Sequence, residues 1–131
     1  MTIPEQKRYL KISFFLKKQP HLSDEQFHQH WKGPHADIAL RNKTFVAKTR
    51  KYNQVHITPT LKQQAATFGA PVTDYDGIAE VWVDSMEDWM EVASDPEFAK
   101  DVGADEALFI LAPIQVQLSY DYLVIPEKAR L

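Results

Sequence analysis

Histidines are the residues of this sequence best suited to acid–base chemistry, and three of the five lie in the segment LSDEQFHQHWKGPHADIAL, residues 22–40. His28 and His30 are two positions apart, so on a helix their side chains point roughly 200° apart around the axis. A metal ion needs ligands that converge on one point, and the chain has neither a cysteine nor an HExxH pattern. We therefore expect no metal site, with His28 on a solvated helix face and His30 half-buried near Phe27 and Trp31.

His35 has a different setting, because it follows Gly33-Pro34, where the helical pattern breaks. At such a break the chain changes direction, and a side chain can point into the space between a helix and a sheet. An imidazole placed there can transfer protons near neutral pH. His35 is thus a candidate catalytic residue, and the alternative is that it only bonds a backbone carbonyl at the helix junction.

His56 lies in RKYNQVHIT, residues 50–58, a segment with the alternation of a strand. Tyr52, Gln54 and His56 share one face of that strand. Three buried polar side chains in a row are costly unless the face lines a wet cavity. We expect His56 to transfer protons, Tyr52 to donate a hydrogen bond and Gln54 to contact the ligand, or else this face is exposed to solvent.

Two carboxylates are the best candidates to orient a histidine. Glu80 lies between Ile78 and Trp82 on one face of a strand, where an unpaired charge would need a partner or a raised pKa. Asp76 precedes a glycine at the start of the same strand. In the alternative interpretation Asp76 is a turn residue and Glu80 pairs with Lys11 across the sheet.

Several aromatic side chains could line a pocket for a flat ligand. Most aromatic residues belong to a hydrophobic core, but they also form the walls of binding sites. The candidates for substrate binding are Phe15, Phe68, Trp82 and Phe109.

The composition narrows the classes of partner. Lys and Arg number 15 against 18 Asp and Glu, so the net charge is -3 with no basic stripe for a nucleic-acid backbone. No apolar run is long enough for a signal peptide or a membrane span, and the four glycines are too scattered for a phosphate-binding loop. We expect one cytoplasmic domain, residues 1–131, that binds neither nucleic acid nor membrane.

Periodicity predicts the elements that must position these residues. Ser23 with Gln26, and Ser85 with Asp88, are capping pairs that start two helices. A shorter helix is expected over residues 103–111. Alternating apolar residues predict strands at 9–16, 50–58, 76–84 and within 113–125.

Each half of the chain therefore consists of a strand, a capped helix and a strand, the β-α-β-β-α-β order of an α+β ferredoxin-like domain. Helices on one face of the sheet would leave the other face, which we expect to be apolar, without cover. Since most homo-oligomers are two-fold dimers, we predict a homodimer whose sheets face one another. Segment 59–75 is long for a loop and is expected to form a helix ending at Gly69 or a lid.

Two stretches carry a family resemblance. FFLKKQPHLSDEQFHQHWKGPHADIA and DYDGIAEVWVDSMEDWMEVASDPEF resemble the two halves of the EthD-type proteins, which form dimeric α/β barrels. The resemblance extends from Tyr9 to Tyr120, and His35 matches the family's characteristic histidine. Within this family the chain is similar to fungal proteins of aromatic polyketide pathways, among them decarboxylases of anthraquinone-type acids such as atrochrysone carboxylic acid.

The resemblance implies a lyase of aromatic polyketide biosynthesis, and decarboxylation of a polyketide acid is the preferred reaction. No cofactor is expected, so the tools are proton donors, acceptors and oriented hydrogen bonds. His35 and His56 would transfer protons, oriented by Glu80 and Asp76. The alternatives are a cyclase or dehydratase of the same fold, and a non-catalytic barrel that binds a hydrophobic aromatic molecule.

Overall fold

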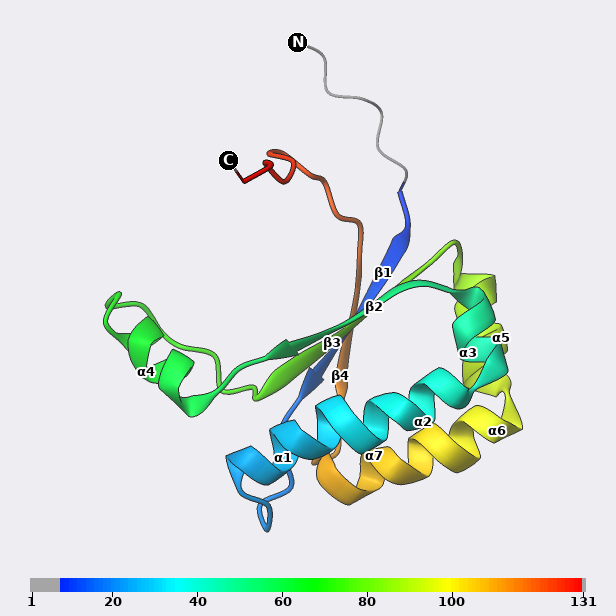
Figure 1. Ribbon diagram of the computed structural model, residues 1–131, viewed down its shortest axis with the longest axis horizontal. Helices are drawn as coiled ribbons and strands as arrows, with labels where there is room; N and C mark the ends of the chain where they lie inside the picture. Colours follow the sequence, from blue (N-terminus) through cyan, green and yellow to red (C-terminus); the bar gives the residue numbers. More distant parts are fainter. Residues whose placement is uncertain (1–7, 131) are drawn as a thin grey trace.

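One four-stranded antiparallel sheet organises the protein, seen in Figure 1 as a computed structural model. The structure describes residues 8–130. The predictions for the N-terminus and for a domain of residues 1–131 also include residues 1–7 and 131, which lie outside this range. The strand order is β2-β3-β1-β4 and every neighbouring pair is antiparallel, which confirms the ferredoxin-like connection. The strands are β1 (Leu10–Leu16), β2 (Thr49–His56), β3 (Gly77–Val83) and β4 (Gln115–Ser119).

The helices form a second layer on one side of the sheet, with α4 projecting away from it (Figure 1). Among residues 8–130, no helix is long and apolar enough to cross a membrane. In chain order the helical elements are α1 (Asp24–His30), η1 (Trp31–His35), α2 (Ala36–Arg41), α3 (Lys43–Lys48), α4 (Pro59–Ala66), α5 (Met86–Ser94), α6 (Pro96–Phe98), η2 (Ala99–Gly103) and α7 (Ala104–Phe109).

The first helix does not end at Gly33-Pro34, so that prediction is wrong. The chain continues from α1 into η1, which is a π-helical turn, and then directly into α2. Proline has no N–H and cannot make the α-helical hydrogen bond of its position. A π-helical turn does not contain that bond, so the wider turn tolerates Pro34. His35 closes this turn and therefore has helical backbone geometry on both sides.

The predicted capping interactions are present at both main helices. The Ser23 hydroxyl accepts a hydrogen bond from the Gln26 N–H at 3.1 Å, and the Gln26 side chain accepts one from the Ser23 N–H at 2.8 Å. The Ser85 hydroxyl accepts from the Asp88 N–H at 3.2 Å. Each cap satisfies donors that a helix start leaves free, which fixes where α1 and α5 begin.

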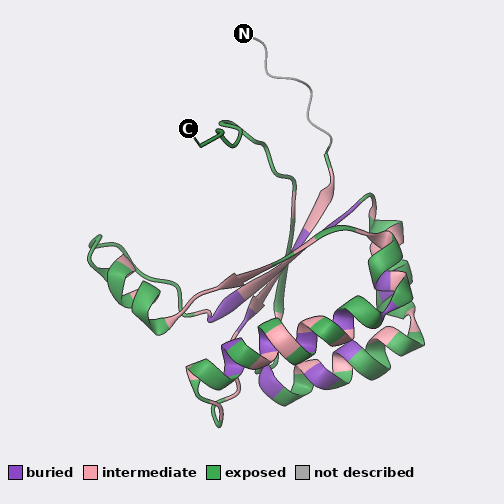
Figure 2. Cartoon of the chain, viewed as in Figure 1, coloured by how far each residue is buried: buried purple, intermediate pink, exposed green. Residues whose placement is uncertain are grey.

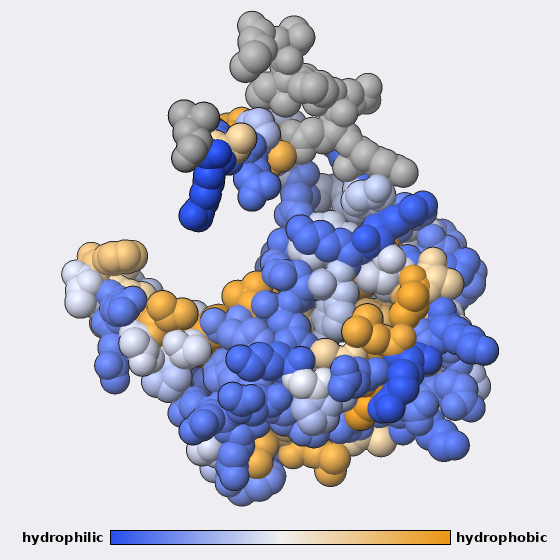
Figure 3. All heavy atoms as spheres, viewed as in Figure 1, coloured by the Kyte–Doolittle hydropathy of each residue, from blue (hydrophilic) through white to orange (hydrophobic). Residues whose placement is uncertain are grey.

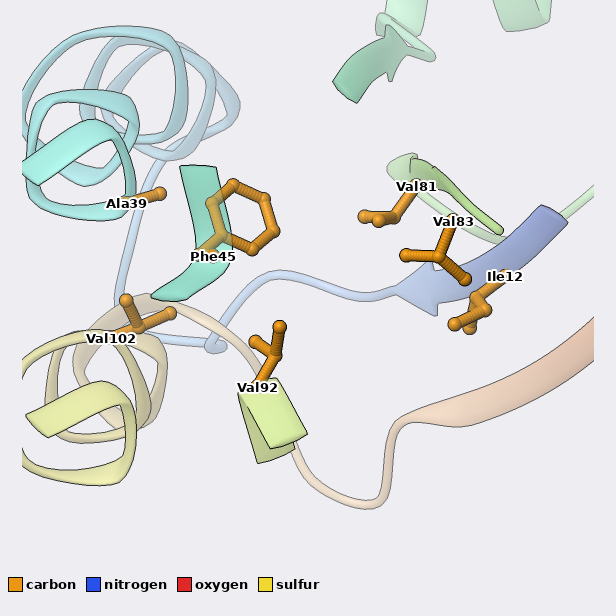
Figure 4. Packing of buried hydrophobic residues seen from close by; sticks show 7 residues of the cluster. All are labelled: Ile12, Ala39, Phe45, Val81, Val83, Val92 and Val102. Atoms are coloured by element: carbon orange, nitrogen blue, oxygen red, sulfur yellow. The ribbon is translucent and has the colours of Figure 1, made fainter. Parts of the chain in front are cut away.

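The core lies between the sheet and the helices, as the buried positions in Figure 2 indicate. From the sheet, Ile12, Val81 and Val83 point toward Phe45 and Val92 of the helical layer (Figure 4). Burial of each such side chain stabilises the fold by roughly 1.5–3 kcal/mol. A second cluster, around Leu16, Phe27, Trp31, Phe109 and Ile110, joins α1 and η1 to α7.

The opposite face of the sheet is less apolar than expected. Ser13 and the ion pair between Lys11 Nζ and a Glu80 carboxylate oxygen, 2.8 Å apart, lie among its apolar side chains. Trp82 on this face donates from its indole N–H to Asp121 at 2.7 Å. The prediction of an apolar face is therefore wrong in part, because strand alternation places Lys11, Ser13 and Glu80 together on this side.

Two segments extend from the body without joining the core. The predicted strand in 113–125 is formed only over β4, and the apolar side chains of residues 122–125 are exposed. Segment 59–75 contains the expected helix, α4, while Gly69 has the positive φ of 77° that suits the end of a helical turn. Leu61 and Phe68 are exposed on this arm, which stands apart from the body in Figure 3.

We expect Gly77→Ala to destabilise the protein. An added Cβ would lie 2.4 Å from a ring carbon of Trp31, which is buried in the core, so β3 or η1 would have to shift. Overpacking of this kind costs about 1–3 kcal/mol of unfolding free energy, measured by urea denaturation. Gly103→Ala is the matched control, because its Cβ would meet nothing within 4 Å, and equal losses in both variants would contradict the prediction.

Candidate active site

A cavity of about 220 Å³ lies between the inner face of the sheet and the helices. Its walls are mainly apolar, and three titratable side chains face it: His35 from η1, Tyr52 from β2 and Glu106 from α7. The described residues that line it include no lysine or arginine. Its aromatic walls are Phe14, Trp31, Phe45, Trp89 and Phe98.

His35 is held by a carboxylate that comes from the far end of the sequence. Its Nδ1 lies 2.7 Å from an oxygen of Asp105 on α7, and both groups are buried. Since the Nδ1–H donates to the carboxylate, the lone pair of the neutral ring is on Nε2. Asp105 also accepts from His30 Nε2, at 2.9 and 3.1 Å from its two oxygens.

Burial keeps His35 neutral. Loss of hydration lowers the pKa of the His35 imidazole below its usual value, although the hydrogen bond and charge of Asp105 act in the opposite direction. At neutral pH the ring therefore has a free lone pair and can accept a proton. This is the protonation state that a general base requires.

Glu106 has the complementary property. Burial, together with the charge of the neighbouring Asp105, raises the pKa of the Glu106 carboxyl to about 7. In a substantial fraction of the molecules, the Glu106 carboxyl is thus protonated at neutral pH and can donate a proton. One cavity consequently contains both a base, His35, and an acid, Glu106.

Asp105 and Glu106 were missed by the sequence analysis. Val102, Asp105 and Phe109 are three and four residues apart, so they lie on one stripe of the helical run η2–α7. Val102 and Phe109 are buried, and an acid on such an apolar stripe must find a buried partner. That pattern is the signal that could have identified Asp105.

Tyr52, Gln54 and His56 share one face of β2, and that face is turned toward the helices. Tyr52 lines the cavity, while Gln54 and His56 lie further along the strand and do not. His56 Nδ1 lies 2.7 Å from Nδ1 of His28. The prediction that His28 is solvated is wrong: its ring is buried against Phe27 and pairs with His56.

Among residues 8–130, neither the Glu80 nor the Asp76 carboxylate makes a hydrogen bond or an ion pair with His35 or His56. Glu80 is on the opposite face of the sheet, where Lys11 and Asn53 bond its carboxylate, so the alternative of a structural pair describes it. Burial alone would raise the pKa of Glu80, but these hydrogen bonds outweigh it and the pKa is lowered. Asp76 accepts from the Lys18 N–H at 2.9 Å and pairs with Lys62 at 3.1 Å.

The four aromatic candidates are dispersed, and none lines the cavity. Phe15 and Trp82 lie on the opposite face of the sheet, and Phe68 is exposed on the α4 arm. Phe109 is buried in the core and packs its ring against His35, with ring centres 4.9 Å apart. Alternation predicted which residues share a face, but not which face the helices would cover.

Among residues 8–130, no group of three or more His, Asp or Glu side chains is placed to hold a metal ion. Residues of segment 59–75 do not line the cavity; they form a separate groove between the arm and His56.

Comparisons with known proteins agree with the fold. Residues 19–111 match the EthD domain. The chain is 31% identical over 114 residues to a dehydratase, CTB10, of Cercospora beticola, covering 82% of this chain and 85% of that protein.

Two solved structures share the architecture at low sequence identity. An EthD family protein of Bacillus halodurans has a TM-score of 0.60 and 16% identity, with 87% of this chain and 99% of that chain covered. A dimeric ferredoxin-like protein of unknown function from Bacteroides fragilis has a TM-score of 0.56 and 11% identity, with 86% and 94% covered. Together with the domain match, these likenesses show that the chain belongs to the EthD domain family.

Proposed function

We propose that the protein is a cofactor-independent lyase that eliminates water from an aromatic polyketide. The observation that carries this proposal is the pairing of a neutral base, His35, with a protonatable acid, Glu106, in one apolar cavity. The similarity to a dehydratase supports elimination of water over other lyase reactions. Decarboxylation, which the sequence analysis preferred, becomes the second candidate.

Dehydration of a β-hydroxy ketone needs one base and one acid. His35 Nε2 takes the proton from the carbon next to the carbonyl, and the electrons of that C–H bond form the new double bond. Glu106 gives its proton to the leaving hydroxyl, so the C–O bond breaks and water departs. Tyr52 donates a hydrogen bond to the carbonyl oxygen, where negative charge develops. Transfer of the proton from His35 to Glu106 restores the starting state.

Decarboxylation is favoured by a different observation, the lack of a cationic side chain among the described cavity residues. An apolar cavity without a cation stabilises a substrate carboxylate poorly, but it does not disfavour the neutral carbon dioxide that the carboxylate releases. The surroundings therefore favour loss of carbon dioxide. Tyr52 would again stabilise the enolate oxygen, and Glu106 would protonate the carbon that loses carbon dioxide.

The cavity size limits how much of a substrate it can enclose. A cavity of roughly 150 Å³ holds benzene, whereas pockets for drug-sized ligands begin at about 300 Å³. The 220 Å³ cavity therefore suits one or two fused rings. Val116 lines it and is half exposed on β4, so the remainder of a larger polyketide would extend toward this edge of the sheet.

Mass spectrometry of the reaction separates the candidates. We expect the purified protein, without added metal or cofactor, to convert atrochrysone carboxylic acid with loss of water. Catalysed loss of carbon dioxide alone would establish the decarboxylase instead. Binding of the anthraquinone emodin with no turnover of the acid would favour a non-catalytic binding protein and contradict the proposal.

Variants and pH test the two proton-transfer groups. His35→Ala and Glu106→Gln should each lower kcat by at least about a hundredfold, because general acid and base groups contribute that much. Since Glu106 must be protonated and its pKa is about 7, wild-type kcat/KM should fall as the pH rises through 7. The fall on the acid side should occur below the usual histidine pKa, as protonation removes the base.

The matched controls are His21→Ala and Glu25→Gln, which change exposed residues outside the cavity. They should retain wild-type activity and its pH profile. A folded Glu106→Gln variant with normal kcat, or with the alkaline decline unchanged, would remove Glu106 from the mechanism.

We also propose that two copies of the chain associate as a homodimer. The apolar residues 122–125, which follow β4, are exposed, and a structural relative is described as dimeric. Exposed apolar surface of this kind is typical of interfaces. Light scattering at micromolar concentration should give the mass of two chains, and a mass near 15.1 kDa would contradict the dimer.

A further inference from the structure

A continuous hydrogen-bonded chain leads from α1 to the cavity wall. Nδ1 of His28 lies 2.7 Å from Nδ1 of His56, and Nε2 of His56 lies 2.9 Å from Oε1 of Gln54. The Gln54 amide nitrogen is 2.9 Å from the Trp31 carbonyl oxygen and 3.4 Å from the Tyr52 hydroxyl. Of these five residues, only Trp31 and Tyr52 line the cavity.

One backbone carbonyl fixes which groups donate and which accept along these hydrogen bonds. The Trp31 oxygen can only accept, so the group of Gln54 that faces it must be the donating NH₂. The Gln54 oxygen then faces His56, whose Nε2 must carry a proton to make the bond. If the ring of His56 is neutral, its Nδ1 accepts, and the donor is the Nδ1–H of His28.

The surroundings keep both rings neutral. Burial, together with the neighbouring His28 and Lys32, lowers the pKa of His56 to about 4. Burial also lowers the pKa of His28, where Asp76 and Asp24 act in the opposite direction and Lys32 adds to the decrease. At neutral pH the pair therefore exists as one donor and one acceptor.

The other ring nitrogen of His28, Nε2, is consistent with a hydrogen bond donated from His28 to His56. Nε2 of His28 is buried and makes no hydrogen bond to any group of residues 8–130. The Ile57 carbonyl is near enough to raise the pKa of His28 but lies outside hydrogen-bonding geometry to that nitrogen. A buried N–H without an acceptor is rarer than an unused acceptor, which favours a bare lone pair at Nε2.

At the other end, the chain determines what the Tyr52 hydroxyl can do. Its oxygen accepts from the Gln54 amide at 3.4 Å, and this bond lowers a pKa that burial raises. Because the amide nitrogen only donates, the Tyr52 proton must go elsewhere. The charge of Glu106 also acts on Tyr52, so the phenol and the candidate acid border the same space.

We propose that His28, His56 and Gln54 form a positioning chain that keeps the Tyr52 hydroxyl as a hydrogen-bond donor to the substrate. This inference rests on the proposed lyase function and deepens it. His56 and Gln54 thereby act through Tyr52, rather than as the proton-transfer and ligand-contact residues that the sequence predicted.

Reversing the last link of the chain tests this role. In Gln54→Glu the new carboxylate can only accept, so the Tyr52 hydroxyl must turn its proton toward it and away from the substrate. We expect kcat for atrochrysone carboxylic acid to fall at least about tenfold with little change in KM, while Tyr52→Phe lowers kcat about a hundredfold, as loss of one donor to a developing oxyanion does.

The double variant distinguishes positioning from a general loss of structure. If Gln54 acts only through Tyr52, Gln54→Glu should change kcat by less than about twofold in the Tyr52→Phe background, since coupled residues are not additive. Equal losses in both backgrounds would overturn the proposal. Gln29→Glu, the same change at an exposed position of α1, is the control and should behave as the wild type.

A measurement without substrate keeps the inference separate from the proposed reaction. Histidine ring ¹⁵N shifts of the wild-type protein, assigned with single His→Gln variants, should show His56 protonated on Nε2 and His28 on Nδ1 at pH 7. The reverse tautomers, or a charged His56, would overturn the chain whatever the enzyme does. Correct tautomers in a protein that converts no polyketide would reject the proposed function but leave the hydrogen-bonded chain established.

Discussion

The buried carboxylate of Asp105 is the interaction on which the candidate site depends. It accepts hydrogen bonds from both His30 and His35, and so joins α7 to the first helical run of the chain. Without it, two imidazoles would lose their acceptor, and a buried polar group without a partner keeps the full cost of its desolvation. Burial and the same charge raise the pKa of Glu106, so the acid–base properties of the cavity also depend on helix packing.

The apolar walls make a small number of polar groups sufficient. Burial lowers the pKa of His35 and raises those of Tyr52 and Glu106, and in each case the neutral form is favoured. A site whose groups are neutral at rest avoids unpaired charge, and each hydrogen bond inside it is stronger than it would be in water. The proposed reaction uses these properties, because charge then develops only where the substrate reacts.

The π-helical turn η1 connects the two hydrogen-bonded systems of the site. Its first residue, Trp31, accepts from Gln54 and thereby fixes the direction of the chain that ends at Tyr52. Its last residue, His35, bonds Asp105. Wide turns of this kind often occur at functional sites. Here the irregular turn lets Trp31 bond the Gln54 side chain of β2, and lets His35 bond the buried Asp105 of α7.

The sequence by itself determined the elements that depend on local physics: the strands, the caps, and the shared face of Tyr52 and His56. Alternation sorts strand residues into two faces, but only packing decides which face the helices cover, and this placed Glu80 outside the cavity. Asp105 follows His35 by 70 positions, so no local propensity relates them. Their contact and the shifted pKa of Glu106 arise only when helix packing removes all three from water.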